Sequence, residues 1–359
     1  MQIGTALSIM QLTRHQLYYK PKAGKPGRRP SETTLLLKDG QTMAVDNQVV
    51  IDQIRQRQSD ADLRSGYKRM TAALMLVGFF IGQKKVYRLM KENALLMPRI
   101  TRASRQYAQY RIVCPQRPLH VLEMDIKSVW IESSRRNAYI LTILDTFTRY
   151  VLHWSIGFTM KSKQIQHAWD EVIEQHLEPN LSFGWKVHIE IRSDNGPQFT
   201  SALVREYFKE NYLNQVFTHP YTPQENGHIE SFHSILSQSL DDCYWSIKHV
   251  ESRLKTFYFN YNNHRIHSGA AMLPPKMFWD AWNMDLIRCE VLKNRKVRFK
   301  LIAKHQLIPG IISQKETSCI SRAERTYEKE NRSGDIYSNT ASNLTPVYLP
   351  SSVTSCIEI

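Results

Sequence analysis

The sequence has few cysteines and no long apolar run. Its five cysteines are odd in number, lie far apart and are never spaced as C-x-x-C: Cys114, Cys243, Cys289, Cys319 and Cys356. This pattern argues against a disulfide framework and against a cysteine-ligated zinc site. No stretch approaches about 18 consecutive apolar residues and no signal peptide is visible at the start, so we expect a cytoplasmic protein without a membrane span.

Acidic residues are scarce in the first third of the chain. Residues 1–118 hold 21 Lys and Arg against 7 Asp and Glu, a net charge of +14, whereas residues 119–359 hold 27 against 26, a net charge of +1. A surface charged only for solubility would mix both signs along the whole chain. The asymmetry favours a basic front end that contacts a nucleic-acid backbone and a nearly neutral second part with another task.

The basic front end divides into helical units and linkers. Thr13 is a predicted N-cap of a short second helix, which gives residues 1–19 the outline of a partial helix-turn-helix. Further on, Gly78 separates two predicted helices, the later of which has a basic face. The remaining boundaries are 20–44 for a basic linker, 45–97 for a helical, helix-turn-helix-like DNA-binding domain and 98–118 for a second basic linker.

From residue 119 the pattern changes to strands. Three consecutive strand patterns are followed by alternating helix and strand patterns, which indicates an α/β domain with a mixed sheet over 119–280. After Pro275 the pattern decays, and we expect residues 281–359 to form a C-terminal extension whose distal part is disordered. The predicted elements are strands at 119–130, 137–145, 150–157, 187–192 and 215–218, and helices near 162–176, 199–211 and 225–241.

Three acidic residues occupy suggestive positions in this second part. Strand alternation aims Asp125 away from the apolar face of its strand, and Asp194 lies in a turn just past the end of another strand. Glu230 projects from the polar stripe of an amphipathic helix. Each has an ordinary alternative, as an exposed strand residue, a turn former and a solvated helix residue. Glu123 faces the same way as Asp125 and is the competing candidate on that strand.

Carboxylates from two strands and a helix can converge on a hard cation. Mg²⁺ takes oxygen ligands and leaves positions for water and phosphate oxygens. Two such ions about 4 Å apart can activate an attacking oxygen and stabilise the leaving one during phosphoryl transfer. The three acids together therefore favour metal-dependent chemistry on phosphodiesters over three unrelated surface residues.

The spacing and surroundings of the three acids resemble a known family. Asp194 lies in SDNGPQFTS, and Glu230 follows after 35 intervening residues in an N-x-x-x-E helix that begins at Asn226. With Asp125, this is similar to the DDE triad of bacterial insertion-sequence transposases with a retroviral-integrase-like core. The match covers about residues 45–280 and includes further landmarks in order: Gly66 to Met70, Lys85 to Met90, Leu144 to Arg149, Pro220, Pro223, Tyr261 to His267, and Pro274 with Pro275.

The resemblance implies an α/β, RNase H-like mixed-sheet catalytic core preceded by an all-α helix-turn-helix region. It implies a DNA transposase that cleaves insertion-sequence ends and transfers the strand by 3′-hydroxyl attack, with Asp125, Asp194 and Glu230 as catalytic residues and ligands of two Mg²⁺ or Mn²⁺ ions. Its partners would be double-stranded DNA at element ends and target, further copies of the chain, and an upstream-frame transposase protein. Expected DNA contacts are Arg14, Lys68, Arg69, Lys84, Lys85, Arg88, Asn226, His233 and Arg265.

The chain departs from the family pattern in places. Many relatives carry Lys or Arg seven residues after the glutamate, where this chain has Ser237, with His233 nearby as a weaker substitute. Ile266 replaces the usual proline of the Y-N-x-x-R-P-H element. Residues 1–113 contain one histidine and no cysteine, so we expect no zinc domain ahead of the core.

Two alternative functions stay open at this stage. One is a catalytically inactive or truncated DNA-binding regulator of transposition, which Ser237 and the incomplete first helix-turn-helix leave open although the triad is complete. The other is a metal-dependent nuclease of the same fold that cleaves without joining. For all three we expect a nucleoid-associated protein.

Overall fold

The computed structural model describes residues 3–20, 30–98, 113–180, 182–184, 186–218, 226–292 and 297–314. Most of the expected linker at 98–118, and the expected disorder beyond residue 314, lie outside these residues. Among the described helices, none is both long and apolar enough to cross a membrane.

The first two helices are short. α1 spans Ile3–Ile9 and α2 spans Arg14–Leu17. The predicted cap is confirmed, because the Thr13 side chain accepts a hydrogen bond from the Gln16 N–H while the Gln16 side chain accepts one from the Thr13 N–H. This reciprocal pair is a capping box, which begins α2 at the expected residue.

A β-hairpin follows where a linker was expected. β1 (Thr33–Lys38) pairs antiparallel with β2 (Gln41–Asp46) through a turn at Asp39 and Gly40, which have φ angles of +51° and +76°. Two consecutive positive φ angles are typical of the two-residue hairpin turn that Asp-Gly favours. The expected linker at 20–44 is therefore too long, and the all-α description of the front region omits this hairpin, because Asp-Gly between two strand-like runs itself favours a hairpin.

Three helices complete the front domain, which we call the helical domain (residues 30–98). They are α3 (Asn47–Ser59), α4 (Tyr67–Leu76) and α5 (Gln83–Glu92), and β3 (Phe79–Phe80) joins the hairpin to make a three-stranded sheet. The predicted break at Gly78 is confirmed, with a φ of +107°. The three helices share one apolar core, with Ile54, Met70 and Val86 fully buried.

The second domain is built on a mixed sheet. Its strands are β4 (Val121–Ile131), β5 (Arg136–Asp145), β6 (Val151–Gly157), β7 (Glu190–Ser193) and β8 (Asn214–Phe217), in the order β6-β5-β4-β7-β8. β9 (Cys243–Tyr244) also pairs with β4. β4, β5 and β6 are antiparallel neighbours, whereas β7 and β8 join in parallel. This is the mixed sheet that the sequence pattern predicts.

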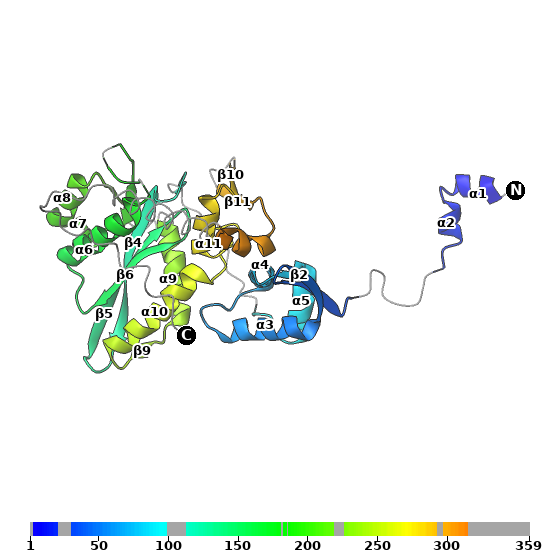
Figure 1. The fold of residues 1–359 in the computed structure, drawn as a ribbon, viewed down its shortest axis with the longest axis horizontal. Helices are drawn as coiled ribbons and strands as arrows, with labels where there is room; N and C mark the ends of the chain where they lie inside the picture. The colour runs from blue at the N-terminus through cyan, green and yellow to red at the C-terminus, as the bar shows by residue number, and fades with distance from the viewer. Residues whose placement is uncertain are drawn as a thin grey trace, which may run out of the picture.

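Helices cover both faces of this sheet (Figure 1). α6 (Ser162–Val172), continued by a π-helical turn at Ile173–Leu177, packs with α7 (Pro197–Thr200) and α8 (Ala202–Glu210) on the face that includes Leu122 and Met124. α9 (Gly227–Ser239) and α10 (Ile247–Asn263) pack on the other face, against Val129 and Ile131. Because side chains alternate along β4, Glu123 and Asp125 face α9.

Regular structure continues past Pro275. α11 (Pro275–Trp282) leads into the antiparallel pair β10 (Ile287–Val291) and β11 (Val297–Leu301), followed by a 3-10 turn at His305–Leu307. Phe147 packs edge-on against Trp282 and Phe299 in a small aromatic core. Regular structure is therefore present in the described residues up to 314 although the sequence pattern is weak there, because aromatic contacts with distant residues order this segment.

Candidate active site

Strand register brings two of the three predicted acids together. β4 and β7 run in parallel with Val121 opposite Glu190 and Glu123 opposite Arg192. Two residues further along the same register, Asp125 comes level with Asp194. β7 ends at Ser193, and no described strand pairs with β4 on this side between Met124 and Val129. Asp194 therefore lies in the turn beside an open edge of β4, at the carboxyl end of β7 where open α/β sheets bind ligands.

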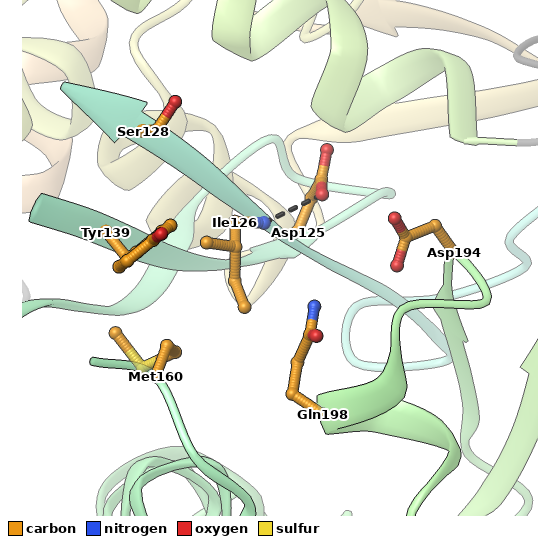
Figure 2. A pocket seen from close by; sticks show the side chains of 7 residues that line it. All are labelled: Asp125, Ile126, Ser128, Tyr139, Met160, Asp194 and Gln198. Carbon is orange, nitrogen blue, oxygen red and sulfur yellow. Dashed lines mark hydrogen bonds between the residues drawn. The ribbon is translucent and has the colours of Figure 1, made fainter. Parts of the chain in front are cut away.

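A cavity of about 400 Å³ lies at this open edge. Figure 2 shows Asp125 and Asp194 approaching it from neighbouring elements, with the Gln198 amide beside them. Its full lining is Asp125, Ile126, Ser128, Tyr139, Met160, Asp194 and Gln198. A volume of this size is in the range of small-ligand sites.

Asp125 is held by two contacts. One carboxylate oxygen accepts a hydrogen bond of 2.7 Å from the N–H of Ile126. The other lies 3.3 Å from His233 Nδ1 on α9, and 27% of the Asp125 side chain remains exposed. The carboxylate is thus oriented by β4 and by α9, yet still reaches solvent.

Asp194 is exposed and is held by its own turn. Its carboxylate accepts a hydrogen bond of 3.0 Å from the N–H of Gly196, and Asn195 donates to the carbonyl of Thr218 at 3.0 Å. Partial burial raises the pKa of Asp194, the nearby charge of Asp125 raises it further, and the Gly196 N–H opposes both. Two carboxylates that repel each other across a cavity are an arrangement that a bound cation stabilises.

Glu230 lies on α9, one helical turn before His233. Residues three apart on a helix share a face, so Glu230 is on the side of α9 that reaches Asp125 through His233. Its side chain is exposed and does not line the cavity. Within the described residues, no three His, Cys, Asp or Glu side chains are close enough together to hold a metal ion. The structure therefore brings Asp125 and Asp194 together and leaves Glu230 to one side.

Glu123, the competing acid on β4, is fully buried. One of its oxygens accepts a hydrogen bond of 2.7 Å from the N–H of Ile229 at the start of α9. Burial raises the pKa of Glu123 to about 7, opposed by that hydrogen bond and by the charges of Arg149 and Arg192. Its position ties β4 to α9 rather than opening to the cavity, which distinguishes it from Asp125.

The expected DNA contacts on the front domains fall into two groups. Arg14, Lys68 and Lys84 are exposed, and Arg69 is partly buried. Lys85 and Arg88, by contrast, are engaged within the fold. Lys85 donates to the carbonyl of Thr33, and Arg88 donates to the carbonyl of Ser31.

The expected DNA contacts in the core are mostly turned inward. Asn226 is 7% exposed at the start of α9, and the ring of His233 lies against Asp125. Arg265 is also 7% exposed, and its guanidinium donates to the carbonyl of Asp62. Contact of Arg265 with DNA stays a prediction, and in this arrangement the guanidinium stabilises the junction of the two domains instead.

Sequence reasoning missed several residues of the site. Gln198 was present in the quoted SDNGPQFTS motif, and its place in the first turn after Asp194 could have indicated a cavity position. Tyr139 and Met160 also line the cavity, but they come from β5 and from the segment before α6, and no local pattern indicates this.

Two family models match the part of the chain that holds this site. The family described as integrase core domain matches residues 115–223, and a second family of the same description matches residues 211–275. The chain is 24% identical over 218 residues to the insertion element IS476 uncharacterized 39.2 kDa protein of Xanthomonas euvesicatoria, covering 60% of each chain. It is 23% identical over 253 residues to the transposase for insertion sequence element IS904 of Lactococcus lactis, covering 65% of this chain and 94% of that protein.

The solved structures to which the chain has a distant similarity include retroviral integrases. The simian T-cell lymphotropic virus intasome in complex with PP2A regulatory subunit B56 gamma is 15% identical, covers 60% of this chain and 70% of that chain, and has a TM-score of 0.39. The HTLV-2 integrase catalytic core domain in complex with magnesium is 17% identical, covers 42% and 92%, and has a TM-score of 0.32. Residues 115–275 thus match families described as integrase core domain, and the chain is similar to proteins of bacterial insertion elements.

Proposed function

We propose that this protein is a DNA transposase that cleaves strands at insertion-sequence ends and joins the freed 3′-hydroxyl to another phosphodiester. The observation that carries the proposal is the pairing of Asp125 and Asp194 at the open edge of β4, on one cavity. The integrase-core matches and the insertion-element relatives support DNA transposition in general, and the positions of these acids support the specific chemistry.

The donor set fits a divalent cation. Asp125 and Asp194 offer oxygen ligands of the kind that Mg²⁺ or Mn²⁺ takes, and the charge of Asp125 already raises the pKa of Asp194. When bound, two such ions would activate the attacking oxygen and stabilise the leaving one. We propose Glu230 as the third ligand, contributed by α9.

The chain's own residues position the reacting groups. The Ile126 N–H and His233 fix the carboxylate of Asp125, and the Gly196 N–H fixes that of Asp194. Such preorganisation lowers the cost of aligning a phosphodiester with its attacking oxygen. Gln198 has an amide at the cavity that can donate to a phosphate oxygen.

We further propose that the basic front end carries most of the affinity for double-stranded DNA. Residues 1–118 hold a net charge of +14, and exposed cations such as Lys68 and Lys84 lie on the helical domain. Transposition joins two element ends to one target, so we propose that several copies of the chain assemble on DNA, at the nucleoid.

The test is a cleavage and joining assay. Purified protein, a labelled duplex carrying the source element's end and a target plasmid are incubated with Mg²⁺ or Mn²⁺, alongside Glu230→Gln. The matched control is Glu206→Gln, an exposed acid on α8. Metal-dependent joined product that is lost in Glu230→Gln and kept in Glu206→Gln supports the proposal.

Other outcomes identify the alternatives. Nicking without joining would indicate a nuclease of the same fold. DNA binding without either product, also after addition of the upstream-frame product, would indicate a regulator of transposition.

A further inference from the structure

The helix that carries Glu230 is held at both ends by residues outside the triad. At its start, the Ile229 N–H donates to Glu123 at 2.7 Å. At its end, the carbonyl of Ser239 accepts two hydrogen bonds from Arg253 on α10, from Nε at 3.2 Å and from Nη2 at 3.0 Å. The last carbonyls of a helix have no partner within the helix, so a double contact there fixes the end of α9.

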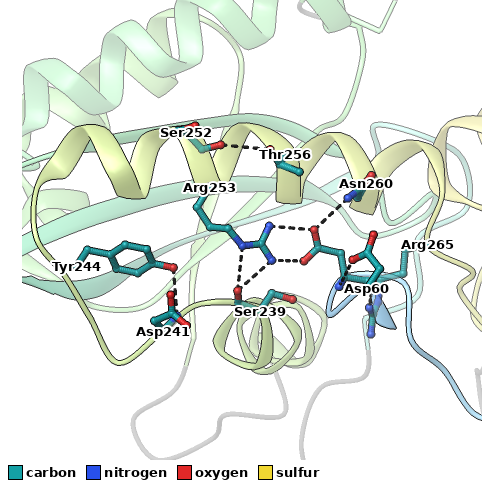
Figure 3. A network of polar contacts seen from close by, with 10 residues as sticks. Asp60, Ser239, Asp241, Tyr244, Ser252, Arg253, Thr256, Asn260 and Arg265 are labelled. Carbon is teal, nitrogen blue, oxygen red and sulfur yellow. Dashed lines mark hydrogen bonds and ion pairs between the residues drawn. The ribbon is translucent and has the colours of Figure 1, made fainter. Parts of the chain in front are cut away.

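Arg253 is itself held by an acid of the other domain. Asp62, in the connection between α3 and α4, accepts hydrogen bonds from Nη1 and Nη2 of Arg253, the first at 3.0 Å, and from Asn260 Nδ2 at 3.1 Å. Figure 3 shows Arg253 at the centre of this network, between α10 and the end of α9 at Ser239. One guanidinium thus bridges the helical domain and the helix of the third acid.

This bridge is the polar centre of the junction between the helical domain and the core. Asp62 is 2% exposed, Arg57 donates to the carbonyl of His264 at 2.9 Å, and Ala73 packs against Ile266. Burial alone would raise the pKa of Asp62, but hydrogen bonds from Arg253 and Asn260 and the charge of Arg253 leave it below its ordinary value. At neutral pH the carboxylate of Asp62 is ionised, and both of its oxygens accept hydrogen bonds.

The surroundings of Asp62 are rich in cations. Burial, with the charge of Arg69 added, lowers the pKa of Arg265 to about 10, and the charges of Arg265 and Arg69 also act on His267. The buried carboxylate of Asp62 offsets this positive charge. Docking of the helical domain therefore supplies both the partner of Arg253 and the compensating charge.

We propose that Asp62 is a positioning residue: through Arg253 it fixes the C-terminal end of α9, so that docking of the helical domain sets the position of Glu230 relative to Asp125 and Asp194. The catalytic consequence rests on the proposed function, since it assigns Glu230 to the triad. The mechanical link from Asp62 to α9 does not depend on that assignment. DNA that binds the helical domain would thereby influence the active site from the other domain.

Two variants separate this link from simple adhesion between domains. Asp62→Asn keeps the shape of the side chain and removes its charge, so both docking and the hold on α9 weaken. Arg253→Lys keeps a cation for Asp62, but one ammonium lacks the planar fork that serves Asp62 and Ser239 together. Docking should survive in Arg253→Lys while the end of α9 loosens. The matched control is Asp52→Asn, which removes an exposed acid paired with Arg55 on α3.

Hydrogen–deuterium exchange on the full chain without DNA measures the effect. In Asp62→Asn and Arg253→Lys, we expect the amides of the C-terminal half of α9 to exchange about tenfold faster than in the parent protein. In the control Asp52→Asn, these amides should exchange at the parent rate. The double variant should show less than the sum of the two single effects, because both act through one contact. If Asp62→Asn loosens α3 and α4 while α9 keeps its protection, or if the two effects add, the proposal is overturned.

Joining activity gives the second readout. Both variants should lower the joining rate about tenfold while DNA affinity stays within a few-fold, and Asp62→Glu should restore part of the rate. Equal rates in the parent and both variants would overturn the catalytic part. If the parent protein joins no DNA, the proposed function fails, whereas the exchange data still decide whether Asp62 controls α9. If Asp62→Asn does not fold, the contrast between Arg253→Lys and Asp52→Asn decides it.

Discussion

The edge of β4 that forms the proposed active site and the junction between the domains both depend on carboxylates, but in opposite ways. At the junction, the oxygens of Asp62 accept hydrogen bonds from Arg253 and Asn260 and are hidden from solvent. At the edge of β4, Asp125 and Asp194 accept one backbone hydrogen bond each and face a common cavity. An acid that is hidden from solvent among hydrogen-bond donors holds structure, whereas two partly exposed acids whose charges repel each other are available for a cation.

The strongest test of this contrast is removal of the acids of the proposed active site. Asp194→Asn and Asp125→Asn should each lower strand joining by more than about a thousandfold, because the amide is a poor substitute for a carboxylate ligand. DNA affinity, measured by gel shift, should stay within a few-fold. A parallel loss of binding and joining would show that the front end and the core do not divide these tasks.

The junction should respond in stability instead. Asp62→Asn leaves Arg253 without its ionic partner, and because about a quarter of the Arg253 side chain is exposed we expect a loss of about 2–3 kcal/mol in the free energy of unfolding. Urea denaturation followed by circular dichroism measures this loss. Asp194→Asn, which relieves repulsion, should leave stability unchanged or slightly raised. Equal losses in the two variants would break the comparison.

Stabilisation by Mg²⁺ should depend on the acids at the edge of β4 and not on Asp62 at the junction. Mg²⁺ at ten to a hundred times its Kd should stabilise the parent protein by about 1.4–2.7 kcal/mol, because only the folded state binds it. Thermal denaturation should show this increase in Asp62→Asn as well, but not in Asp194→Asn. An equal increase in Asp194→Asn would place the cation elsewhere.

The junction should also be sensitive to acid. Burial first, and then the charges of three nearby arginines, hold the pKa of His267 well below its ordinary value of 6.5. As the pH falls below about 6.5, His267 binds a proton in the unfolded chain but stays neutral in the folded chain. The free energy of unfolding therefore falls by up to about 1.4 kcal/mol per pH unit. Denaturation curves between pH 7 and pH 5 should show a smaller slope for His267→Gln. An unchanged slope would assign the acid sensitivity to other groups.

The smallest expected effect concerns the contribution of two neighbouring lysines of α5 to DNA binding. Lys84 is exposed, whereas Lys85 donates to the carbonyl of Thr33. Lys84→Gln should weaken DNA binding a few-fold and lower the slope of log affinity against log salt by about one. Lys85→Gln should instead lower stability and leave the slope unchanged. Identical slopes for both variants would place the phosphate contacts away from α5.

Much of the fold followed from local patterns. The strands β4 to β8, the break at Gly78 and the Thr13 cap follow from alternation, helical spacing and capping chemistry, all of which act within a few residues. The resemblance to a family indicated Asp125 and Asp194, and strand register explains why they meet. Glu230 was named by the same resemblance, and its convergence with the pair stays a prediction.

The remainder depends on contacts between distant residues. Asp62 and Arg253 are 191 residues apart, and nothing near Asp62 in the sequence distinguishes it from Asp60. The packing of α11 and β11 depends on Phe147, far earlier in the chain. Arg265 belongs to a motif that suggested a DNA contact, yet its surroundings in the folded chain bury it. Such pairings are set by tertiary packing, which local propensity does not contain.

The sequence separation of Asp62 and Arg253 also sets the interval between the synthesis of these two residues. A ribosome adds about 5–20 residues per second, so the 191 residues from Leu63 to Arg253 take about 10–40 s to synthesise. During that interval the helical domain can fold, because α3, α4 and α5 share a core of their own. The surface around Asp62 that later contacts α10 is exposed to water during this interval. The helical domain therefore docks onto the core late in the synthesis of each molecule.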